Sequence, residues 1–122
     1  MLQTNDPVQQ CQPWELPDNL DFWVGRAGAP WVVNIDLDYF FCRDEGRAPC
    51  LMFSKEYLGR FCEKLRPLIA DGTVAVTTIC LTPDWSFTGG WAPAERLMEL
   101  VLSCLGIDFR LPSAGKRDTN AT

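Results

Sequence analysis

A chain of 122 residues with 16 acidic and 11 basic side chains has the size of one domain and a net charge of −5. This balance argues against nucleic-acid binding, which needs a basic surface, and no apolar run approaches the roughly 18 residues of a membrane helix. The N-terminus also lacks the basic and apolar regions of a signal peptide. We therefore expect a cytoplasmic protein with reduced cysteines, with Cys42 and Cys50, which bracket a polar loop, as the first exceptions.

The sequence contains no histidine. This removes the commonest metal ligand and the commonest general base, and it excludes Ser-His-Asp and Cys-His catalysis within the chain. Any chemistry must use carboxylates or groups supplied from elsewhere.

The first part of the chain reads as an irregular segment followed by a strand and a helix. Residues 1–30 are rich in Gln, Asn, Asp, Pro and Gly, although residues 18–23 could form a short helix. Residues 31–35 are β-branched or aromatic and predict a strand. A helix should follow from the N-cap Ser54 to residue 70, because its apolar residues recur with helical spacing.

The second part repeats this order. Residues 73–81 form a β-branched run that predicts a strand buried on both faces. A helix over about 92–105 should have Pro93 at its first position and Gly106 just beyond its end. Residues 107–111 could add a third short strand.

Alternating strands and helices predict an α/β fold, here a small three-layer unit with a parallel sheet over residues 31–111. The tail 112–122 is expected to be disordered. So few strands leave exposed sheet edges, so we expect a homo-oligomer or a complementing chain. Sites in such sheets form beyond the carboxyl ends of the strands.

Two carboxylates, Asp36 and Asp38, stand at one such end, inside an apolar run. Residues two apart on a strand face the same side, so the pair should lie side by side. Two buried carboxylates repel unless a cation or a shared proton neutralises them. The alternative is a surface turn that leaves both aspartates in water.

Three chemistries use a D-x-D pair at a strand end. A haloacid-dehalogenase-type phosphatase fits less well, because Tyr39 and Phe40 stand where a small residue and Thr or Val are expected. A D-x-D glycosyltransferase is usually longer. In a binuclear manganese hydrolase, hard oxygen ligands hold Mn²⁺ and the metals acidify a bridging water.

Two segments, VVNIDLDYFF and TICLTPDWSFTGGWAPAERLMELVLSCLGIDF, resemble the C-terminal part of an arginase-like family that includes bacterial peptide arginases. The resemblance spans residues 31–111. It implies part of an arginase/deacetylase-like fold, Mn²⁺ as the metal, an arginine-containing peptide as substrate and ornithine as product. Asp36 and Asp38 match the family's Asp-x-Asp metal positions.

The chain departs from that family because it lacks the histidine ligands and the earlier strand that carries them. We therefore expect a partial or split hydrolase that is incomplete alone. The competing hypothesis is a non-catalytic interaction or structural protein derived from the same fold.

Three further residues are candidates for substrate binding: Asp84, Trp85 and Glu95. Asp84 follows a strand end, although Pro-Asp also initiates turns. Glu95 is expected in the first turn of the last helix, where a negative charge also favours the helix dipole. Trp85 belongs to an aromatic loop that either lines a substrate mouth or forms an exposed patch.

Overall fold

The computed structural model describes residues 16–24, 28, 30–43 and 45–112. The irregular segment was predicted for residues 1–30, and its residues 1–15 lie outside the described residues, as do residues 113–122 of the tail predicted to be disordered. The short helix predicted over residues 18–23 is confirmed and begins two residues earlier, at Leu16.

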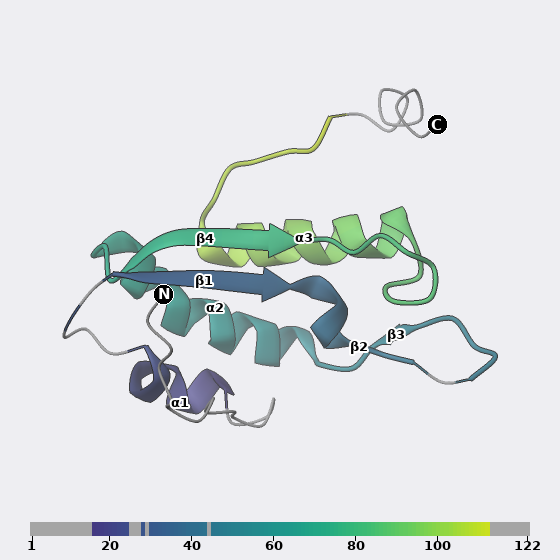
Figure 1. Cartoon of the computed structure of the whole chain (residues 1–122), viewed down its shortest axis with the longest axis horizontal. Coiled ribbons are helices and arrows are strands. Elements are labelled where there is room, and N and C mark those ends of the chain that lie inside the picture. Colours follow the sequence, from purple (N-terminus) through teal and green to yellow (C-terminus); the bar gives the residue numbers. More distant parts are fainter. Residues whose placement is uncertain (1–15, 25–27, 29, 44, 113–122) are drawn as a thin grey trace, which may run out of the picture.

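The predicted order of strand, helix, strand and helix is confirmed (Figure 1). The main elements are α1 (Leu16–Trp23), β1 (Trp31–Asp36), α2 (Lys55–Ala70), β4 (Val74–Cys80) and α3 (Trp91–Leu105). Between β1 and α2 lie the short 3₁₀ helix η2 (Leu37–Phe40) and the hairpin of β2 (Phe41–Cys42) and β3 (Cys50–Leu51). The protein is therefore a small mixed α/β unit.

The two long strands, β1 and β4, pair in parallel, and Asp36 lies opposite Cys80 at their carboxyl ends. The prediction of a third strand over 107–111 is wrong, because these residues join no sheet in the described part of the chain. Ile107 and Phe109 are 38% and 54% exposed, so this segment buries little of the apolar surface that would favour a strand there.

The described helices cover one face of this sheet, and β4 passes in front of α3 in Figure 1. Ile35 is buried against them. The alternate residues point the other way, and Val32 and Val76 are 67% and 49% exposed on that open face. The third layer predicted from the sequence is therefore not formed by the described residues, and β4 is buried on one face only.

Helix α2 forms the centre of the core. Ser54 caps it as predicted, with its hydroxyl oxygen accepting a hydrogen bond from the Tyr57 amide at 3.1 Å. One stripe of the helix is buried, made of Leu58, Phe61, Cys62, Leu65 and Leu68. Cys62 is fully buried in this core, and its burial raises the pKa of the thiol to about 12.

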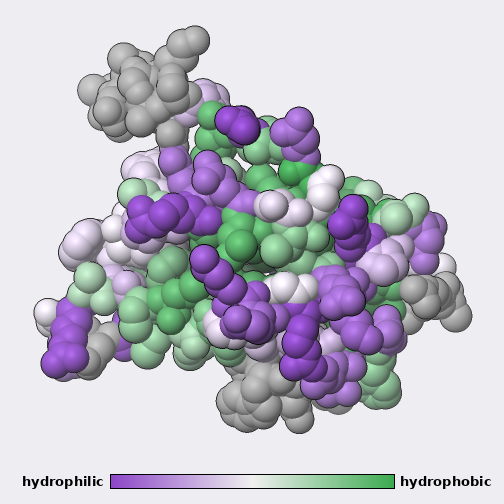
Figure 2. Space-filling model, turned by 180° about the vertical axis from the view of Figure 1, so that it is seen from behind, coloured by the Kyte–Doolittle hydropathy of each residue, from purple (hydrophilic) through white to green (hydrophobic). Residues whose placement is uncertain are grey.

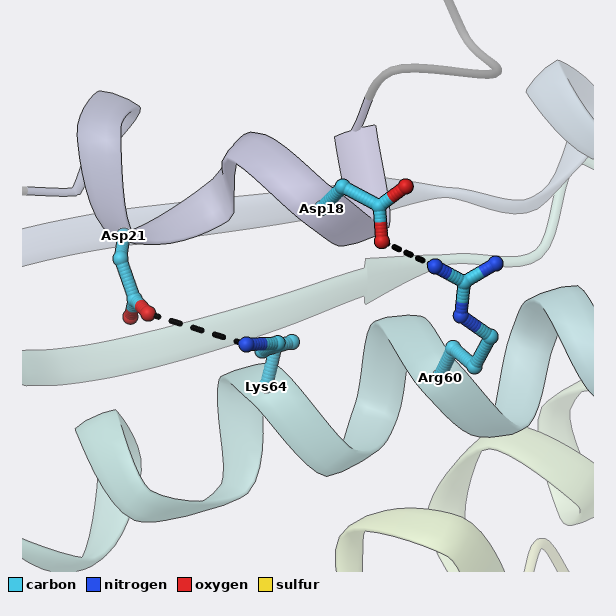
Figure 3. A network of polar contacts seen from close by, with 4 residues as sticks. All are labelled: Asp18, Asp21, Arg60 and Lys64. Atoms are coloured by element: carbon cyan, nitrogen blue, oxygen red, sulfur yellow. Dashed lines mark hydrogen bonds and ion pairs between the residues drawn. The ribbon is translucent and has the colours of Figure 1, made fainter.

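Helix α1 lies along α2 and is joined to it by two ion pairs (Figure 3). Asp18 pairs with Arg60, and Asp21 lies 3.9 Å from Lys64. All four side chains are about half exposed or more, so each pair contributes about 1 kcal/mol or less. The buried Leu20 holds α1 to the core more firmly than these charges do.

Helix α3 begins one residue earlier than predicted, at Trp91, so Pro93 is its third residue and not its first. Proline is still tolerated there, because the first four amides of a helix have no intrahelical partner. Gly106 ends the helix with a left-handed φ of 71°, as the sequence predicted. None of the described helices is both long and apolar enough to cross a membrane.

Candidate functional site at the carboxyl edge of the sheet

The aspartate pair lies where β1 ends, but in a different local structure from the one predicted. The strand stops at Asp36, and Asp38 lies in the 3₁₀ helix η2. Residues three apart eclipse in a 3₁₀ helix, which puts Leu37 and Phe40 together in the core, with 0% and 2% exposure. Burial of these two side chains favours the turn over a continued strand.

The two carboxyl groups nevertheless lie side by side. The pKa of Asp38 is raised above its ordinary 3.8, first because partial burial removes water from the carboxylate. The negative charge of Asp36 and a hydrogen bond between the two carboxyl groups raise the pKa of Asp38 further. The predicted closeness of the two carboxyl groups is therefore confirmed, while a cation between them stays a prediction.

Two threonines, one in β4 and one just after it, bond to polar side chains of β1. The Thr82 hydroxyl donates to Asp36 Oδ1 across 3.4 Å, which is a long hydrogen bond. Two residues before Asp36, the Asn34 side-chain oxygen accepts a hydrogen bond of 2.7 Å from the Thr78 hydroxyl. The open face of the sheet is therefore polar near its carboxyl edge.

Thr82 was not singled out by the sequence analysis, and it adopts a rare conformation. Its φ is +46°, which is uncommon for a β-branched residue and disfavoured for a residue that precedes proline, here Pro83. The buried Thr88 hydroxyl donates to the Thr82 carbonyl at 2.9 Å and holds it in place. The proline and glycines of this loop indicate a turn, but they do not show which residue carries the strain.

Asp84 follows the second strand end, at the same edge of the sheet as the pair. Its carboxylate points into its own turn, where it accepts hydrogen bonds from the Ser86 amide at 2.7 Å and the Ser86 hydroxyl at 2.5 Å. These bonds, with the positive charge of Arg43, lower the pKa of Asp84. Asp84 therefore stays ionised and acts first as a turn former, which was the alternative interpretation.

The remaining predicted substrate residues occupy different positions. Trp85 is 68% exposed in the loop after β4. Glu95 is the fifth residue of α3, so its predicted place in the first turn is wrong, and its Oε1 atom is shielded from solvent. A negative charge gains most from the helix dipole within the first turn, and Glu95 lies beyond that turn.

Arg43 lies in the polar loop between Cys42 and Cys50 and contacts the loop after β4. Its guanidinium lies 4.6 Å from the centre of the Phe87 ring and donates to the Ser86 carbonyl at 3.5 Å. The β2–β3 hairpin is thereby tied to the loop after β4. No local sequence pattern indicates this contact, because it joins residues 43 positions apart.

A shallow hollow of about 210 Å³ lies beside the pair and is lined in part by Asn34, Asp36 and Tyr39. It is smaller than the roughly 300–1,000 Å³ of most ligand pockets. Among the described residues, no group of three or more Cys, Asp or Glu side chains could hold a metal ion. The two carboxylates suit one hard cation, but they do not make a binuclear site.

A larger apolar groove of about 680 Å³ lies between the hairpin and α3. Leu51 of β3 and Leu97 and Leu100 of α3 contribute to its lining. Seen from behind, the molecule shows apolar residues gathered in the middle of this view and hydrophilic ones around them (Figure 2). The groove contains no predicted site residue, so it is not part of the candidate site.

Comparison with known proteins identifies no relative. No family model, curated protein or solved structure matches the chain.

The raised pKa of Asp38 predicts the effect of Asp38→Asn on stability. Because the pKa of Asp38 is higher in the folded than in the unfolded protein, the folded protein binds this proton more tightly. The stabilisation that the proton provides is present at low pH and is lost as the pH rises through the folded pKa. At pH 7 the carboxylates of Asp36 and Asp38 repel each other, and Asp38→Asn removes this repulsion. The substitution should raise the melting temperature by about 1–4 °C, the size expected for a partly exposed charge pair. Thermal melts should show a smaller difference at pH 3.5, and a variant less stable than wild type at pH 7 would contradict the repulsion.

Proposed function

We propose that the chain supplies the Asp36–Asp38 pair to an arginase-like, metal-dependent hydrolase site that other residues complete. The observation that carries the proposal is the two carboxyl groups held together at the carboxyl edge of a parallel sheet. Their donor set of oxygens suits Mn²⁺. A guanidino group in an arginine-containing peptide is the proposed substrate, on the basis of the sequence resemblance.

The pair alone is an incomplete site. When bound, the metal would supply an acidified water for attack on the guanidinium carbon. The described residues offer two carboxylates for it, while Asp84 is engaged by Ser86. We therefore assign the chain's own residues one role, which is to hold a cation at Asp36 and Asp38, and derive no catalytic step from them.

The completing residues could come from the undescribed part of this chain, from a second copy or from a complementing protein. The sheet in the described residues has two strands, so each keeps one unpaired edge. Such edges favour the addition of further strands. In the proposed assembly, added strands extend this sheet and bring the missing ligands to its carboxyl edge.

A metal titration tests this proposal. Wild type should gain about 1.4 kcal/mol, on the order of 5 °C in Tm, at a Mn²⁺ concentration tenfold above Kd. The double variant Asp36→Asn/Asp38→Asn should lose this gain, although its metal-free Tm rises because the like-charge pair is gone. The comparison is therefore between metal-induced shifts and not between absolute melting temperatures.

The matched control is Asp108→Asn, which removes an exposed carboxylate from the segment after α3. It should keep the full metal shift. Equal shifts in wild type and the double variant would contradict the metal site. In an arginine-peptide assay alongside, the purified chain alone should release no ornithine, and measurable ornithine would show that the site is complete.

A non-catalytic interaction protein is the second candidate. The open face and unpaired edges of the sheet favour it, because they provide a surface for a partner without any chemistry. In that case the metal shift is absent from wild type as well.

A further inference from the structure

Two exposed cysteines lie directly opposite each other in the β2–β3 hairpin. Cys42 and Cys50 are register partners in this antiparallel pair, and both are free thiols. Opposite residues in an antiparallel pair project from the same face of the ribbon, with Cα atoms about 4.5–5.5 Å apart. Disulfides span Cα distances of about 4.4–6.8 Å, so rotation of the two side chains can join these sulfurs.

We propose that Cys42 and Cys50 form a reversible intramolecular disulfide that fixes the hairpin against the loop after β4. The other described cysteines lack this arrangement. Cys62 is fully buried in the core beside Cys104, and Cys80 lies opposite Asp36 and not opposite a cysteine. Exposure and register therefore select one pair for oxidation.

A glutathione disulfide can act as the oxidant. The thiolate of one cysteine attacks it, breaks its S–S bond and forms a mixed disulfide, and one glutathione thiolate leaves. The second cysteine then attacks the protein-side sulfur and releases the other glutathione. In total, the two protein thiols lose two electrons and two protons, and the oxidant takes them up to become two glutathione thiols.

Arg43, the residue after Cys42, connects the proposed disulfide to the loop after β4. The Arg43 guanidinium contacts Phe87 and the Ser86 carbonyl. The same loop begins at Thr82, whose hydroxyl donates to Asp36. Closing the hairpin restricts Arg43, so oxidation should reduce the motion of residues 84–88, which follow Thr82 in the same loop.

The first test equilibrates the full chain in glutathione redox buffers, alkylates the remaining thiols and maps the peptides without reduction. The expected result is the joint loss of the Cys42 and Cys50 thiols, with a peptide link between them and a monomeric band on a non-reducing gel. Cys42→Ser and Cys50→Ser should abolish the link, whereas the matched control Cys80→Ser should keep it. A lasting glutathione adduct, a link to another cysteine or a disulfide between two chains would each overturn the proposal.

The second test measures hydrogen exchange of residues 84–88 in the reduced and oxidised chain. Oxidation should slow exchange in wild type and leave it unchanged in Arg43→Ala, which still forms the disulfide but lacks the contact. Unchanged exchange in oxidised wild type, or equal slowing in Arg43→Ala, would overturn the connection to the loop.

Discussion

Replacing Leu65 with alanine should lower the free energy of unfolding by about 2–5 kcal/mol. Leu65 lies on α2 and is fully buried in the cluster that joins the helices to the sheet. Truncation removes its apolar surface from the core and leaves a cavity, because the packed neighbours collapse only in part. A domain of this size has about 5–15 kcal/mol of stability, so the loss is a large fraction of the total.

Urea unfolding at neutral pH measures this loss, with Leu51→Ala as the matched control. Leu51 is 40% exposed at the hairpin, so the same substitution there should cost about 1 kcal/mol or less. If Leu65→Ala unfolds entirely, Leu65→Met keeps most of the volume and should cost less than about 1.5 kcal/mol. A loss below about 1 kcal/mol for Leu65→Ala would show that α2 is not packed as described.

The sequence predicted this core because α2 carries a clear local pattern. Its apolar residues recur with helical spacing after the cap Ser54, and the same spacing places Leu65 on the buried stripe. The strands β1 and β4 were predicted equally well from their β-branched residues. These features depend on neighbours in sequence, which a single sequence shows.

The layers of the fold were not predictable in the same way. The composition of β4 is that of a doubly buried strand, yet Val76 is 49% exposed on the open face. Whether such a strand is covered depends on how many elements pack around it, and a strand's own composition does not determine that number. For this reason, the prediction of a third layer was wrong for the described residues.

The candidate site shows both a success and a failure of sequence reasoning. The side chains of Asp36 and Asp38 are neighbours, as predicted, but the reason differs from the predicted one. The strand does not continue through the pair; burial of Leu37 and Phe40 favours the 3₁₀ helix η2 instead. The contacts of Thr82 with Asp36 and of Arg43 with Ser86 join residues more than 40 positions apart. No periodicity or capping pattern encodes such pairs.

Replacing Thr88 with valine should cost about 1–3 kcal/mol, although the two side chains have nearly the same shape. The Thr88 hydroxyl is fully buried and donates to the Thr82 carbonyl at 2.9 Å. Valine keeps the volume but loses this donor, and Thr82 then loses the bond that holds its φ of +46°. The substitution should therefore also alter the surroundings of Asp36, whose carboxylate accepts a hydrogen bond from the Thr82 hydroxyl.

Thr77→Val is the matched control for this substitution. The Thr77 hydroxyl is also buried, but it has no hydrogen-bond partner among the described residues. Removing an unsatisfied buried hydroxyl should be neutral or stabilising by about 1 kcal/mol, because no bond is lost and a desolvation cost disappears. In urea unfolding, the free energy of unfolding should therefore fall in Thr88→Val and stay the same or rise in Thr77→Val. Carboxyl NMR resonances should shift at Asp36 in Thr88→Val and stay in place in Thr77→Val, and equal effects of the two variants would contradict the role of Thr88 in holding Thr82.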